Sequence, residues 1–133
     1  MSLAGKRIVI TGGAGVLGQG VAQVAQSQGA DVVLLDVVAD VSDLVGSLIQ
    51  VDLTDPTSLK QCFEQIGDFD VLANIAGGFA MGPAVYETED AMWDAMFTIN
   101  VTTVRRVLNE AMPRLLSVSY THLTLPTSRS VGW

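Results

Sequence analysis

Short runs of consecutive apolar residues alternate along the chain with segments in which apolar residues recur at helical spacing. Four of these runs, rich in Val, Ile and Leu, lie at residues 6–11, 31–36, 48–52 and 69–74. Such runs predict strands that are covered on both faces, as in a parallel sheet. Strands that alternate with helices indicate βαβ units with right-handed crossovers, so the pattern predicts a doubly wound α/β fold.

Three helices are predicted between or after these strands. The first follows a glycine-rich turn and ends before Gly29. Its apolar face is expected to contain Val21, Val24 and Ala25. The second opens with Asp55 as N-cap and Pro56 at its first helical position. Its buried face is expected to contain Leu59, Cys62, Phe63 and Ile66.

A long third helix is predicted from Thr88, which is expected to cap it, while Asp90 adds negative charge to its first turn. Its apolar stripe is expected to contain Phe97, Val101, Val104, Leu108, Ala111 and Leu115. Pro113 predicts a kink or a frayed end, because proline cannot donate the helical hydrogen bond. Arg105 and Arg106 are expected to lie on a solvated face.

Composition narrows the classes of partner. The 133 residues are 49% hydrophobic and carry a net charge of −7. An acidic chain without a basic run argues against nucleic acid or an anionic membrane as a partner. The uncharged stretch Ile8–Ala30 contains six glycines and four glutamines, so no membrane span is predicted. The single cysteine, Cys62, and the absence of a targeting signal indicate the cytoplasm.

The strongest chemical signal lies between the first strand and the first helix. Gly13, Gly15 and Gly18 match the fingerprint G-x-G-x-x-G in that context. Glycines allow a tight turn and a close approach of backbone N–H groups to a pyrophosphate, and the helix N-terminus adds partial positive charge. A dinucleotide can therefore bind to this acidic chain without a basic side chain.

Asp36 ends the second strand, eighteen residues after Gly18. A carboxylate at this position can accept hydrogen bonds from the adenosine ribose hydroxyls and repels a 2′-phosphate. No Lys or Arg lies in the glycine turn or closely follows Asp36. NAD is therefore favoured over NADP. No metal site is predicted, since the only histidine, His122, lies in an atypical tail.

With these features the chain resembles the N-terminal part of a short-chain dehydrogenase/reductase. Thr11–Gly18 resembles the family's T-G-x-x-x-G-x-G turn, with Val16 where its second glycine usually stands. Asp52-Leu53 resembles the adenine contact after the third strand. Asn74–Gly77 resembles the N-N-A-G segment, with Ile75 in place of its second asparagine.

The resemblance also implies roles for individual residues. Asn100 matches the asparagine of the family's Asn-Ser-Tyr-Lys catalytic set and is the catalytic residue implied here. The residues expected to bind the cofactor are Gly12, Gly13, Gly15, Val16, Leu17, Gly18, Asp36, Asp52, Leu53, Asn74, Ala76 and Gly77.

The activity implied is that of an NAD-dependent oxidoreductase acting on a small-molecule carbonyl or alcohol, in a parent that forms a homodimer or homotetramer. The family's catalytic Tyr-x-x-x-Lys is missing, because Tyr86 and Tyr120 are followed four positions later by Asp90 and Thr124. The chain as written is therefore predicted to be inactive. Two alternatives to this oxidoreductase function are a non-catalytic dinucleotide sensor and a family member with epimerase or isomerase chemistry.

Residues 117–133 differ from everything before them. The segment Val118–Thr127 has no acidic residue and no core pattern, and it back-translates into a string that resembles a transposase-end adapter of sequencing libraries. We therefore expect a partial Rossmann-like NAD-binding domain over residues 1–116 and a non-native tail over residues 117–133. A natural Ser/Thr-rich tail is the alternative. Of the doubly wound strand order 3-2-1-4-5-6, this chain is expected to supply 3-2-1-4.

Overall fold

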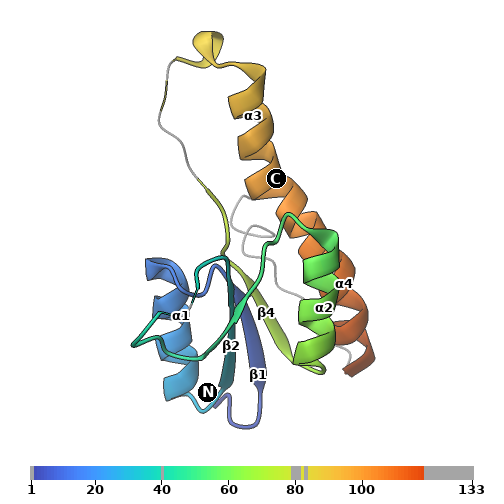
Figure 1. The fold of residues 1–133 in the computed structure, drawn as a ribbon. Helices are drawn as coiled ribbons and strands as arrows, with labels where there is room; N and C mark the ends of the chain where they lie inside the picture. The colour runs from blue at the N-terminus through green and yellow to red at the C-terminus, as the bar shows by residue number, and fades with distance from the viewer. Residues whose placement is uncertain (1, 40, 79–81, 83, 119–133) are drawn as a thin grey trace, which may run out of the picture.

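The computed structural model describes residues 2–39, 41–78, 82 and 84–118. Its centre is a four-stranded parallel sheet in the order β3-β2-β1-β4 (Figure 1). The strands are β1 (Arg7–Thr11), β2 (Asp31–Asp36), β3 (Ser47–Gln50) and β4 (Val71–Asn74). The predicted α/β class and strand order are confirmed. Most of the predicted tail, with Tyr120 and His122, lies outside the described residues.

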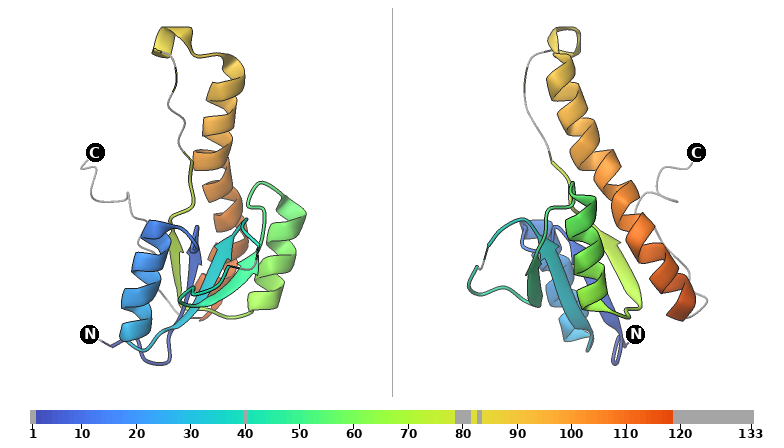
Figure 2. Two further views of the ribbon diagram at one scale, coloured as in Figure 1. Left: turned by 60° about the vertical axis from the view of Figure 1, so that its left-hand side comes forward. Right: turned by 45° about the vertical axis from the view of Figure 1, so that its right-hand side comes forward.

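Helices cover both faces of the sheet, which explains the consecutive apolar runs. Val9, Val33 and Leu35 point toward α2 (Pro56–Ile66) and α4 (Thr103–Val118). The alternate strand positions point toward α1 (Val16–Ser27) on the other face, as Figure 2 shows from two sides. Those positions are Ile8, Ile10, Val32 and Leu34.

The strand boundaries differ slightly from the prediction. β3 ends at Gln50 because its ladder with β2 ends where Asp36 pairs with Gln50. Phe69 precedes β4 and is buried in the core, where its ring packs against Phe63 with centroids 5.8 Å apart. In the run 69–74 only Phe69 and Leu72 are buried, whereas Val71 is exposed, so the prediction of a strand covered on both faces was partly wrong here. The first two residues of the run are not part of the strand.

The predicted buried face is confirmed for α2 and only partly confirmed for α1. All four residues expected on the buried face of α2 are buried, and Asp55 caps the helix by accepting a hydrogen bond from the N–H of Thr57 at 3.0 Å. On α1 the prediction was partly wrong, because Val24 is exposed and the buried positions are Gly18, Ala22 and Ala25. Small residues let this helix approach the sheet closely. Gly29 follows α1 with φ +93°, as its predicted C′ role requires.

The long third helix is composed of three parts: α3 (Asp90–Phe97), the five-residue π-helical segment η2 (Thr98–Thr102) and α4. It is preceded by the short 3₁₀ helix η1 (Val85–Glu87). Thr88 does not cap it, since Glu89 holds the N-cap position and the Thr88 hydroxyl donates to the Ala84 carbonyl instead. The helix continues through Pro113 to Val118.

The predicted apolar stripe of this helix is buried only in α4. Ala111 and Leu115 are buried in the core between α4, α2 and the sheet, and Val104 and Leu108 are half-buried. Val107, which was not predicted as part of the stripe, is fully buried there. Phe97 in α3 and Val101 in η2 are exposed, because this part of the long helix projects away from the sheet (Figure 2). Within the described part of the chain, no helix combines the length and the apolar character needed to cross a membrane.

Candidate dinucleotide site

A cavity of about 430 Å³ lies at the carboxyl ends of the parallel strands. Ligands of doubly wound sheets bind in this position, where the strand order reverses beside β1. Ten of the predicted cofactor residues line it: Gly12, Gly15, Val16, Leu17, Gly18, Asp36, Asp52, Leu53, Ala76 and Gly77. The structure therefore brings together residues from four separate segments of the sequence.

Sequence reasoning missed several lining residues, namely Leu35, Val37, Val51, Thr54, Ile75, Ile99 and Thr103. Most are direct neighbours of predicted positions. Ile99 and Thr103 lie four residues apart and flank Asn100, so the helical period places both on one face. That spacing was the signal from which they could have been found.

The glycine turn is held by close backbone contacts. Gly12 has φ +68°, and a Cβ on it would lie 2.9 Å from the backbone of Ala76. A Cβ on Gly18 would lie 2.2 Å from the Gly12 carbonyl oxygen, so only glycine lets α1 start this close to the turn. Gly13 does not line the cavity; it packs beneath the turn against Leu34.

Val16 stands where the motif that the turn resembles has its second glycine. Gly15 is the N-cap of α1 in an extended conformation, and Val16 is the first helical residue, 96% exposed. The valine side chain is therefore open to solvent at the edge of the cavity. No side chain caps α1, so its N-terminus directs the partial positive charge of the helix dipole at the cavity.

The Asp36 carboxylate is oriented by three backbone N–H groups. Oδ2 accepts a hydrogen bond from Ala14 of the glycine turn at 3.0 Å. Oδ1 accepts from Val37 at 2.8 Å and from Val38 at 3.4 Å. Two carboxylate oxygens offer about four acceptor positions, so the group keeps acceptor capacity for ligand hydroxyls.

Asn74 lies behind the cavity and joins the ends of β1 and β4. The buried Thr11 hydroxyl donates to Asn74 Oδ1 at 3.0 Å and accepts from the N–H groups of Ile75 and Ala76 at 3.1 and 3.2 Å. Asn74 Nδ2 is buried and has no partner among the described residues. Asn74 therefore shapes the loop that lines the cavity and does not itself face it.

The loop after β3 is fixed by Asp52 and Arg106. Asp52 Oδ1 accepts hydrogen bonds from the hydroxyl and the N–H of Thr54, at 2.6 and 2.9 Å. These bonds, the hydroxyl's first, lower the pKa of the Asp52 carboxyl. The Arg106 guanidinium donates to the Thr54 carbonyl. The expectation of a solvated Arg106 was therefore wrong, whereas Arg105 is exposed.

Asn100 lies in the π-helical segment beside the cavity rather than among its lining residues. Its carboxamide bonds both backbone groups of Gly78, which follows the Asn74–Gly77 loop. π-helical turns occur often at functional sites.

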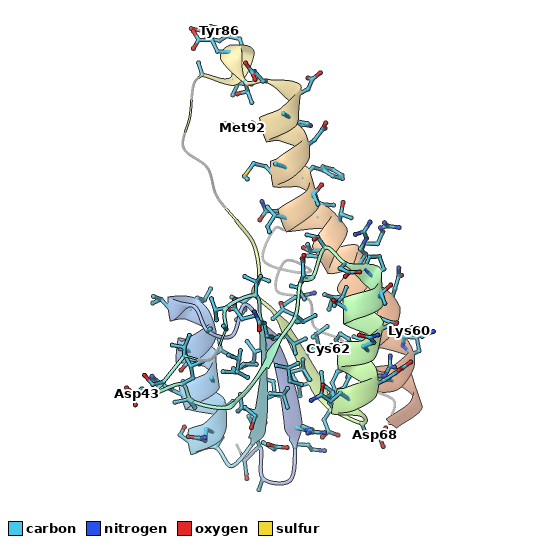
Figure 3. All side chains as sticks on the ribbon, viewed as in Figure 1. Asp43, Lys60, Cys62, Asp68, Tyr86 and Met92 are labelled. Carbon is cyan, nitrogen blue, oxygen red and sulfur yellow. The ribbon has the colours of Figure 1, made fainter. Side chains whose placement is uncertain are left out.

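Tyr86, the one tyrosine among the described residues, is exposed and lies at the end of the molecule farthest from the sheet (Figure 3). Within the described ranges, no three His, Cys, Asp or Glu side chains are grouped as metal ligands.

Known proteins match this chain in sequence and in structure. The model of the short chain dehydrogenase family matches residues 6–122. D-xylose 1-dehydrogenase of Caulobacter vibrioides is 36% identical over 110 residues, which cover 75% of this chain and 44% of that enzyme. The chain thus spans about half the length of the curated relatives it matches.

Solved structures share the fold. An NADH-dependent reductase, A1-R′, solved with NAD, superposes with a TM-score of 0.77 at 28% identity, over 87% of this chain and 54% of that one. Aldohexose dehydrogenase of Thermoplasma acidophilum superposes with a TM-score of 0.79 at 23% identity, over 86% of this chain and 46% of that one. The family match over most of the chain, with this sheet and glycine turn, shows that the protein belongs to the short-chain dehydrogenase/reductase family of oxidoreductases.

Proposed function

We propose that this chain forms the NAD-binding part of a dehydrogenase/reductase that moves a hydride between NAD and a small-molecule carbonyl or alcohol. The observation that carries the proposal is the position of Asp36. Its carboxylate lies on the cavity wall at the end of β2 and bonds the Ala14 N–H of the glycine turn at 3.0 Å. One cavity thus presents a hydroxyl acceptor and a helix N-terminus, the two groups that a dinucleotide requires.

The residues present fit the cofactor. A Cβ at Gly12 or at Gly18 would clash with backbone, so glycine at these positions keeps the turn tight at the start of α1, where we expect the pyrophosphate to lie. Asp36 would accept from the ribose hydroxyls, and Leu53 would pack on the adenine side. When bound, NAD supplies the hydride acceptor or donor. None of the lining residues is Lys or Arg, so the wall offers no cation for a 2′-phosphate, and NADP is disfavoured.

Asn100 is proposed to organise the proton relay of the full catalytic set. The sequence given contains no Tyr-x-x-x-Lys, since Tyr86 and Tyr120 are followed four positions later by Asp90 and Thr124. The chain as written is therefore proposed to bind NAD without turning over a substrate. A longer parent that contains Tyr-x-x-x-Lys would be a reductase, and one that lacks it would be a dinucleotide sensor.

The exposed apolar side chains of α3 and η2 support an oligomeric parent, a homodimer or homotetramer. Trp93, Phe97 and Val101 lie four residues apart and are 64%, 54% and 48% exposed. Residues at this spacing form one stripe on a helix, and a stripe of large apolar side chains is typical of an interface. We propose that this stripe packs against a second subunit.

Calorimetric titration with NAD and NADP tests the cofactor proposal. The wild-type chain is expected to bind NAD more tightly than NADP. Asp36→Asn keeps the shape of the side chain and removes its charge, and it is expected to raise the Kd for NAD about tenfold, as loss of charge-assisted hydrogen bonds does. Glu64→Gln, which removes one charge from the exposed face of α2, is the control and should bind as wild type.

Two results would contradict the proposal. If the folded wild-type chain gives no binding heat with NAD, the proposal that this chain binds NAD is contradicted. If Asp36→Asn keeps the wild-type selectivity between NAD and NADP, the proposal that Asp36 favours NAD over NADP is contradicted.

A further inference from the structure

Gln19 connects two parts of the molecule that the sequence gives no reason to connect. It follows Gly18 on α1 and is half-buried. Its Nε2 donates to the Gly13 carbonyl of the glycine turn at 2.8 Å and to the Val45 carbonyl at 3.2 Å. Its Oε1 accepts from the Val45 N–H at 2.8 Å. One carboxamide thus joins the turn to a residue twenty-six positions later.

The orientation of this carboxamide is determined by its partners. The Val45 N–H can only donate, so the atom facing it must be Oε1. Both Gly13 and Val45 offer a carbonyl to the other end, so that end must be the NH₂ group. Gln19 therefore bonds both backbone groups of Val45 in the way that a neighbouring strand would.

Val45 belongs to the β2–β3 connection, residues 37–46. The described residues of this connection form neither helix nor strand, so its position depends on contacts with other elements. Gln19 holds its end, and the Gln50 side chain holds its beginning by donating to the Val37 carbonyl at 3.1 Å. Val37 lines the cavity directly after Asp36.

One end of the Gln19 bridge lies next to a donor to the Asp36 carboxylate. Gly13 precedes Ala14, whose N–H bonds Asp36 Oδ2 at 3.0 Å. Val37, at the start of the connection, bonds Asp36 Oδ1 at 2.8 Å. A shift of the turn away from the connection would therefore move the Ala14 N–H away from Asp36 Oδ2.

We propose that Gln19 is a positioning residue that sets the affinity for the adenosine and pyrophosphate end of the dinucleotide, by joining the glycine turn to the β2–β3 connection. The inference rests on the proposed function, since it concerns the same cavity. Gln19 is not among the lining residues, so its effect on a ligand acts through Gly13, Val45 and the groups they carry.

The test compares Gln19→Leu with Gln23→Leu in the full 133-residue chain. Leucine keeps the approximate volume and removes all three hydrogen bonds of Gln19. Gln23 lies one helical turn later and is exposed, so its substitution makes the same chemical change without a bridge. The probes are NAD and ADP-ribose, which share adenosine and pyrophosphate but differ in the nicotinamide. The Val45 amide is followed by hydrogen exchange.

Gln19→Leu is expected to raise the Kd for NAD and for ADP-ribose by the same factor, about tenfold, equivalent to about 1.4 kcal/mol. Exchange of the Val45 amide should become faster in the same variant, whereas Gln23→Leu should match wild type in all three measurements. Should Gln19→Leu not fold, Gln19→Glu replaces it. That variant keeps the acceptor for the Val45 N–H and loses both donations, and it is expected to show the same loss of affinity.

The failures can be told apart. A wild-type chain that binds neither probe overturns the dinucleotide site, and the inference with it. If wild type binds both probes and the Gln19 variants bind them as tightly as wild type does, the Gln19 inference alone is overturned. An affinity loss for NAD that is absent for ADP-ribose also overturns it, because the effect would then lie at the nicotinamide end.

Discussion

The carboxamide of Asn100 and the backbone of Gly78 bond each other in both directions. Asn100 Nδ2 donates to the Gly78 carbonyl at 2.9 Å, and the Gly78 N–H donates to Asn100 Oδ1 at 3.0 Å. Nδ2 also donates to the Met96 carbonyl one turn earlier at 3.0 Å. Asn100 therefore joins the π-helical segment to the loop after β4, and its side chain is fixed before any ligand binds.

Gly77→Ala is expected to break this relationship. The new Cβ would lie 2.7 Å from Asn100 Oδ1, closer than such contacts occur, so the carboxamide or the loop must move. We expect a loss of about 1–3 kcal/mol in the free energy of unfolding, as for other overpacked sites, measured by urea denaturation. In the Asn100→Ala background the same substitution should cost much less. Additive effects of the two substitutions would contradict the contact.

Two glycines on α1 offer a matched comparison. Gly18→Ala is expected to destabilise the chain and weaken NAD binding, because its Cβ would lie 2.2 Å from the Gly12 carbonyl oxygen. Gly20→Ala meets no atom within 4 Å and should stabilise the helix by about 0.5–1 kcal/mol through the better helix propensity of alanine. Thermal unfolding of both variants measures the difference, and effects of the same sign would contradict the packing of the turn.

Thr11→Val tests the connection behind the cavity. The substitution keeps the side-chain shape but leaves the N–H groups of Ile75 and Ala76 without their acceptor. Buried unsatisfied groups cost about 1–3 kcal/mol each, so we expect a large loss of stability in urea. Thr103→Val is the control: this threonine is equally buried, but its hydroxyl makes a single bond, to the Ile99 carbonyl at 2.7 Å. Equal losses in the two variants would contradict the role of Thr11.

The sheet was predictable because each of its central strands is covered on both faces. β2 begins and ends where the apolar run between Asp31 and Asp36 does. The buried face of α2 was also visible, since its four apolar residues recur at helical spacing. The glycine turn and Asp36 follow local spacing rules, and the structure places them around one cavity.

Features that depend on distant contacts were not predictable. Gln19 shares α1 with Gln23 and Gln26, and nothing local distinguishes the one that reaches Val45. The π-helical segment changes only the hydrogen-bond spacing, which leaves no trace in composition. The exposure of Phe97 depends on where α3 leaves the sheet, whereas helical periodicity records only which residues share a face.

Cys62 offers a test of core integrity that needs no ligand. Burial raises the pKa of its thiol from 9.0 to about 11. At pH 8 the thiolate fraction is therefore about a hundredfold lower than for an ordinary thiol, and only the thiolate reacts with iodoacetamide. We expect alkylation of the folded chain to be at least that much slower than in urea. Because the pKa is raised on folding, the thiol's contribution to stability is present below pH 9 and is lost as the pH rises toward 11. Cys62→Ala should remove that loss. Rapid alkylation of Cys62 in the folded chain would show that α2 does not stay packed against the sheet.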